Sequence, residues 1–119
     1  MDVRDLYTTI GVDFDDVLAL LRKEDRVKTY LVQTMEEPAF AELDRAMASR
    51  EYDSAFRAAH TIKGMGMNLM LEPMTAAAVD LVECLRNGVA PEDEDTAAML
   101  YTRLKEQCDL LASLVRELS

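Results

Sequence analysis

The sequence of 119 residues has the length of a single domain, and its 13 Lys and Arg stand against 23 Asp and Glu, a net charge of −10. This acidic balance disfavours nucleic acid and anionic membranes as partners, because both are bound through clustered basic side chains. Two cysteines do not make a disulfide scaffold, no apolar run approaches the roughly 20 residues that span a bilayer, and no basic targeting segment opens the chain. We expect a soluble, cytoplasmic, monomeric protein with one domain over residues 1–119.

The composition predicts an all-α fold. The chain has only four glycines, three prolines and no tryptophan, and good helix formers such as Ala, Leu, Met and Glu dominate it. Nowhere do strand-forming residues alternate with polar ones over a useful length. No internal repeat and no long linker divides the chain.

Helix start and stop signals recur along the chain. Asp2 and Asp13 are suitable N-caps for two short helices, the first of which ends near Gly11. Four of the later helices are long enough to form a four-helix up-down bundle, and the short extra N-terminal helices can cover one end of it. The later helices are predicted over 24–35, from Pro38 to a turn at Arg50–Glu51, over 52–68, from Glu72 to an Asn87-Gly88 stop, and from Pro91 to Leu118.

The helix predicted over 52–68 has two faces of different chemistry. On a helical wheel at about 100° per residue, His60 points one way and is surrounded by Phe56, Arg57, Lys63, Gly64 and Met67. The opposite side suits close packing inside the bundle, because it collects small and apolar residues: Ala55, Ala58, Ile62, Met65, Gly66 and Leu69. We therefore expect His60 to face solvent.

Three neighbours of His60 are unusual on a solvent-facing helix surface. Gly64 costs up to about 1 kcal/mol relative to alanine in mid-helix, and it lies one turn after His60, where it leaves the imidazole uncovered. Phe56 and Met67 are apolar, and packing within the chain does not require them unless the N-terminal helices cover them. Apolar side chains around an exposed polar group are typical of a docking patch, to which Arg57 belongs unless it is simply solvated.

An exposed histidine without a base or metal partner suits a group carrier better than an active site. An imidazole is a good nucleophile at neutral pH, because its ordinary pKa of about 6.5 leaves much of it uncharged. Lys63 lies one turn further along the same face, where its ammonium can meet a phosphoryl oxygen. These residues favour a group carrier in which the carried group is held on His60 beside the Lys63 ammonium.

The segment Ala-His-Thr-Ile-Lys-Gly at 59–64, followed by Asn68 and Leu69, resembles the signature of histidine-containing phosphotransfer (HPt) domains. That pattern has a His, a Lys three positions on and a Gly four positions on, inside an all-helical chain. The length and helix order of the whole chain are similar to the family as well, which implies a stand-alone HPt protein. Two positions depart from the pattern, since the family commonly has a small residue at Met65 and a glycine at Met70.

The resemblance implies that His60 exchanges a phosphoryl group with the aspartate of a response-regulator receiver domain, or receives it from a histidine kinase. Gly64 would give the partner clearance, as its family counterpart does. The receiver brings the Mg²⁺ and most of the catalytic groups, so this chain is expected to need no cofactor and to be a carrier and not an enzyme.

Other interpretations stay open at this point. A helical adaptor would bind a partner through Phe56 and Met67 without any phosphate. A detached equivalent of a chemotaxis kinase's phospho-accepting domain would be phosphorylated by a kinase in trans. A zinc site made of His60, Cys84 and Cys108 is disfavoured because both cysteines lie on inward helical faces, so no metal is expected.

Overall fold

The computed structural model describes residues 1–119, and every regular element in it is a helix. The all-α prediction is confirmed. No helix is both long enough and apolar enough to cross a bilayer. The elements in chain order are α1 (Val3–Thr9), α2 (Phe14–Leu21), α3 (Glu24–Met35), α4 (Ala39–Ala48), α5 (Tyr52–Asn68), α6 (Glu72–Leu85), the 3-10 turn η1 (Pro91–Asp93) and α7 (Glu94–Arg116).

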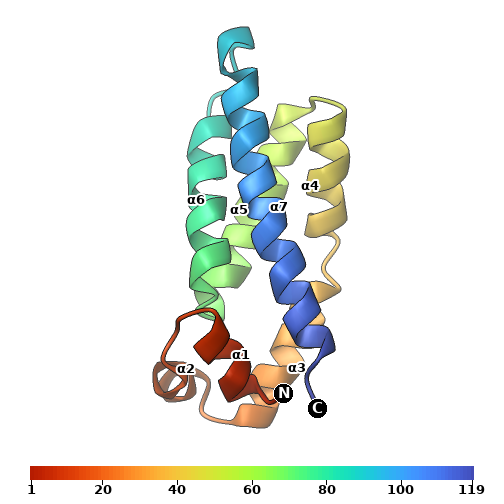
Figure 1. Cartoon of the computed structure of the whole chain (residues 1–119). Coiled ribbons are helices and arrows are strands. Elements are labelled where there is room, and N and C mark those ends of the chain that lie inside the picture. Colours follow the sequence, from red (N-terminus) through yellow and green to blue (C-terminus); the bar gives the residue numbers. More distant parts are fainter.

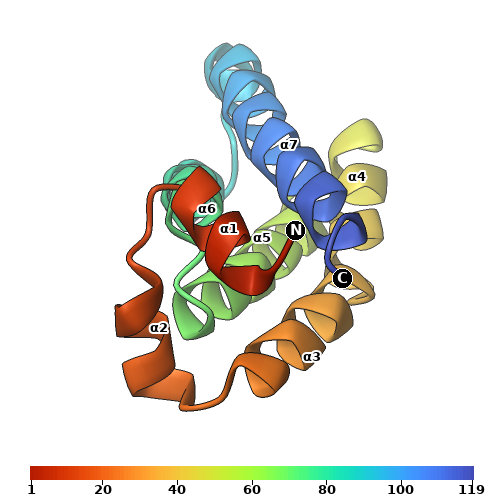
Figure 2. The ribbon, with the colours of Figure 1, turned by 60° about the horizontal axis from the view of Figure 1, so that its bottom comes forward.

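Helices α4 to α7 form the predicted four-helix bundle, in which each helix runs antiparallel to the one before it (Figure 1). The three N-terminal helices α1 to α3 lie across one end of this bundle (Figure 2). One hydrophobic core of 25 buried residues runs through both parts. The fold class and the covering role of the N-terminal helices are therefore as the sequence predicts.

The N-terminal helices are attached to the end of α5 by a buried tyrosine. Tyr7 is fully buried, its hydroxyl donates a hydrogen bond to the Leu69 carbonyl at 2.6 Å, and its ring lies 5.5 Å from that of Phe14. Burial raises the pKa of the Tyr7 hydroxyl above its ordinary value. Asp2 and Asp13 cap α1 and α2 as predicted, each accepting a hydrogen bond from a backbone N–H of the first turn.

The end of α5 explains one departure from the family pattern. Met70 has a φ of +55°, and the Leu71 N–H donates to the Gly66 carbonyl at 2.9 Å, which is the geometry of a Schellman C-cap. A glycine takes this left-handed conformation without steric cost, whereas a residue with a Cβ pays for it. The position that the family fills with glycine is therefore a backbone requirement at a helix end.

Helices α5 and α6 approach each other closely at Gly66. A Cβ on this residue would lie 2.2 Å from the Thr75 Oγ1 and 3.3 Å from the Met74 Cε. The small-residue face of α5 is buried as predicted, and Ala59 belongs to it too. Met65 also packs against the core from this face, but it is only half-buried and lines a pocket between α3 and α5 with Tyr30 and other residues.

Helices α4 and α7 are joined by a polar contact. The Asp44 carboxylate accepts a hydrogen bond from the Tyr101 hydroxyl at 2.5 Å and pairs with the Lys105 ammonium at 3.0 Å. A small cavity of about 110 Å³ lies beside this contact and is lined mainly by apolar side chains, among them Phe40 and Ile62. The contact therefore closes the bundle where α4 and α7 leave a gap.

Candidate functional site

His60 lies in the middle of α5 with its side chain exposed to solvent, while its neighbours Ala59 and Ile62 are fully buried. The helix thus separates the two faces as the wheel predicts, and the imidazole stands on the outer one. His60 is also the single histidine of the chain. Any histidine chemistry of this protein therefore belongs to this position.

The backbone one turn after His60 is open. A Cβ placed on Gly64 would have no atom of another residue within 4 Å outside its own helix. This glycine therefore fills no packing need inside the chain, in contrast to Gly66 two residues later. Lys63 is half-exposed beside it, and none of the seven ion pairs of the structure includes its ammonium.

Phe56 lies one turn before His60 and is half-buried at the edge of the core, with ring centroids of the two residues 6.1 Å apart. It is covered by the C-cap residue of α6, because the Arg86 guanidinium carbon lies 5.5 Å from the centre of its ring. Arg86 also pairs with Glu83 at 3.0 Å. Met67, at the far end of this surface, is 60% exposed.

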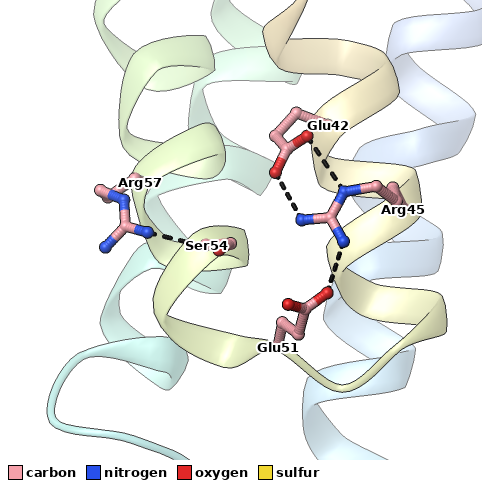
Figure 3. A network of polar contacts seen from close by, with 5 residues as sticks. All are labelled: Glu42, Arg45, Glu51, Ser54 and Arg57. Carbon is pink, nitrogen blue, oxygen red and sulfur yellow. Dashed lines mark hydrogen bonds and ion pairs between the residues drawn. The ribbon is translucent and has the colours of Figure 1, made fainter.

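The other flank of His60 is a charged groove between α4 and α5 (Figure 3). Arg45 pairs with Glu42 at 2.6 Å and with Glu51, and its hydrogen bond holds the pKa of the Glu42 carboxyl below the usual range. Arg57 is exposed at the rim and donates one hydrogen bond, to the Ser54 hydroxyl at 3.3 Å. Its guanidinium is therefore weakly held and available to a ligand or partner.

The two cysteines lie away from this surface. Cys84 on α6 and Cys108 on α7 are half-buried free thiols, and burial raises the pKa of Cys108 to about 12. No group of three His, Cys, Asp or Glu side chains is arranged to hold a metal ion.

The structure thus brings together four of the predicted site residues, His60, Lys63, Gly64 and Phe56, along one outer strip of α5, with Met67 at its end and Arg57 on its flank. Sequence reasoning missed the contribution of α6, namely Arg86 over Phe56 and Glu83 beside it. The only sequence signal was the spacing of three between these two residues, which is common on exposed helices and points to no site by itself.

A comparison with known protein families matches most of the chain. The model of the family described as Hpt domain matches residues 26–117, which include most of α3 and all of α4 to α7. Helices α1 and α2 lie outside the matched part. No curated protein and no solved structure matches the chain at a significant level.

Proposed function

This chain belongs to the Hpt domain family, and from that premise we propose that His60 carries the phosphoryl group, which it exchanges with the aspartate of a receiver domain. Hpt domains are phosphocarrier modules of phosphorelays and interact with receiver domains and kinases. The observation that carries the assignment is that the only histidine of the chain is exposed to solvent, on a helix of the bundle that the family model matches.

The transfer step requires only one reacting group from the carrier, the His60 imidazole. The unprotonated ring nitrogen of His60 attacks the phosphorus of an aspartyl phosphate, so that an N–P bond forms while the acyl O–P bond breaks. The electron pair of the broken bond stays on the aspartate carboxylate, and the second ring nitrogen keeps its proton. Total charge is conserved, because a neutral imidazole becomes an imidazolium that carries a phosphoryl dianion and a carboxylate is released.

The neighbours of His60 have supporting roles in this proposal. Lys63 stabilises the phosphoryl oxygens, since its ammonium is free of any ion pair and lies one turn along the same face. Gly64 lets the receiver approach the imidazole closely. Met67 at the end of the strip and Arg57 on its flank contact the docked receiver, and the receiver supplies the Mg²⁺ that phosphoryl transfer requires.

The test is phosphoryl transfer from receiver domains of the same genome, each charged beforehand with acetyl phosphate. We expect one receiver to add a single phosphoryl group to the protein, stable in base and lost in acid, as read by intact mass. His60→Gln abolishes this gain, and Lys63→Ala slows it. Equal labelling of the wild type and His60→Gln, or no labelling by any receiver or kinase, would overturn the proposal.

The same experiment separates the alternatives. An adaptor that binds through Phe56 and Met67 without phosphate would show no mass gain in any variant. Its affinity for the partner would be unchanged in the His60→Gln variant and lost in the Met67→Asp variant. A carrier loaded by a kinase in trans would gain the phosphoryl group from ATP and that kinase with no receiver present. We expect receiver-dependent labelling.

A further inference from the structure

The contacts between α5 and α6 establish which residues of α6 lie beside His60. Gly66 meets Thr75 at one end of the contact, and Phe56 meets Arg86 at the other. Since antiparallel helices advance equally per residue, the position level with His60 is close to residues 81–82. Leu81 and Val82 are buried, and the exposed residues of α6 nearest that level are Asp80 and Glu83, of which only Glu83 makes an ion pair.

Glu83 pairs with one of the two cations on this side of the imidazole. Its carboxylate pairs with the Arg86 guanidinium at 3.0 Å, and that guanidinium lies over the Phe56 ring, which in turn neighbours His60. The hydrogen bond from Arg86, with a smaller contribution from the charge of Lys63, holds the pKa of the Glu83 carboxyl below its usual range. The Glu83 carboxylate is therefore held by Arg86, the C-cap of α6, while Lys63 on α5 makes no ion pair with it.

A phosphoryl group on His60 would be attracted by Lys63 and Arg86. It is a dianion at neutral pH with three strong acceptor oxygens, and a guanidinium binds such oxygens through its planar fork. Arg86 is rotatable and half-exposed, so it can turn from Glu83 toward the phosphoryl group. Glu83 then keeps a negative charge close to that group and loses its partner, and both effects disfavour the phosphorylated state.

We propose that Glu83 is a positioning residue of the carrier, which competes with the phosphoryl group of His60 for Arg86 and so favours release of that group to a receiver. The inference rests on the proposed function of His60. It assigns α6 a part in setting the balance between phosphohistidine and aspartyl phosphate. Glu83 touches neither reactant, and it acts through Arg86.

The test is the equilibrium of phosphoryl exchange between the protein and a charged receiver domain, compared for Glu83→Gln and a matched control. Glu106→Gln is that control, because Glu106 is exposed on α7, makes no ion pair, and its loss changes the net charge by the same amount. We expect Glu83→Gln to shift the equilibrium toward phosphohistidine by about two- to fivefold, the range of exposed ion pairs. Glu106→Gln leaves it unchanged.

Further measurements exclude a merely structural effect. The shift shrinks at high salt, because the interaction is between exposed charges. Glu83→Asp restores part of the wild-type balance, Arg86→Gln shifts it the opposite way, and thermal unfolding of Glu83→Gln stays close to that of the wild type. If the wild type is labelled and Glu83→Gln behaves like Glu106→Gln, or shifts toward aspartyl phosphate, the inference is overturned while the function stands. If the wild type takes no label, the proposed function itself fails.

Discussion

Substituting Gly66 by alanine measures how closely α5 and α6 must pack. The new Cβ would lie 2.2 Å from the Thr75 Oγ1, so one of the two helices or the threonine has to move. Rotating Thr75 relieves the contact poorly, since its own Cβ would still be 3.3 Å away and its hydroxyl would lose the hydrogen bond that it donates to the Leu71 carbonyl at 2.8 Å. Overpacking of this kind costs about 1–3 kcal/mol.

A second glycine in the same helix provides the reference. Gly64 is two residues away and has open space where the Cβ would go, so Gly64→Ala gains only the helix propensity of alanine, about 1 kcal/mol. The same gain applies to Gly66→Ala and offsets part of its cost. The difference in unfolding free energy between the two variants therefore isolates the helix contact, at about 1–3 kcal/mol in favour of Gly64→Ala.

The assay is urea unfolding followed by far-UV circular dichroism, with the free energy extrapolated to water at an unchanged m-value. We expect Gly64→Ala to be more stable than the wild type and Gly66→Ala to be less stable. The double variant Gly66→Ala/Thr75→Ala should be more stable than the sum of the two single changes in unfolding free energy predicts, because the two residues share one contact. Two glycine variants of equal stability would refute the packing that places α6 beside His60.

Three further outcomes follow from the polar groups of the bundle. Burial raises the pKa of the Tyr7 hydroxyl above its ordinary value of 10, so the stability that this burial contributes is complete below about pH 10 and is lost as the pH rises further. Tyr7→Phe should therefore reduce the loss of thermal stability at alkaline pH. An equal loss in Tyr7→Phe and the wild type would contradict this prediction. Burial also raises the pKa of the Cys108 thiol to about 12 and raises the pKa of the Cys84 thiol. Iodoacetamide at about pH 8 should therefore alkylate both thiols more slowly in the folded protein than in urea, and Cys108 more slowly than Cys84. Equal alkylation rates in the folded and unfolded protein would contradict this prediction. Asp44→Asn should lower the unfolding free energy by about 0.5–1 kcal/mol, because it weakens the contact with Lys105, and a neutral result in urea unfolding would show that α4 and α7 do not depend on it.

The helices were predictable because the sequence marks their ends. The predicted bounds 24–35 and 52–68 agree with α3 and α5, and Asn87-Gly88 ends α6 with both residues at positive φ. The last helix differs at its ends, since Pro91 opens a 3-10 turn and the regular helix stops at Arg116. Caps and stops act over a few residues, so a local pattern is enough to place them.

The site was predictable only along α5. The wheel places His60, Lys63 and Gly64 on one outer face because three and four residues make one helical turn. Arg86 reaches the same surface from α6 through the register of two helices, which depends on the close contact at Gly66 and on no local pattern. The wheel places Met65 on the inward face, and it does pack against the core, but a pocket between α3 and α5 leaves it half-exposed, which depends on helix packing and not on local spacing.

Both ends of the chain meet where the N-terminal helices cover the bundle, and the Ser119 N–H donates a hydrogen bond to the Met1 carbonyl at 2.9 Å (Figure 2). A short peptide linker can therefore join them, and the exposed loop between α6 and η1 is a suitable place for new termini. Such a circular permutant would keep every helix whole while making α7 the first element of the bundle.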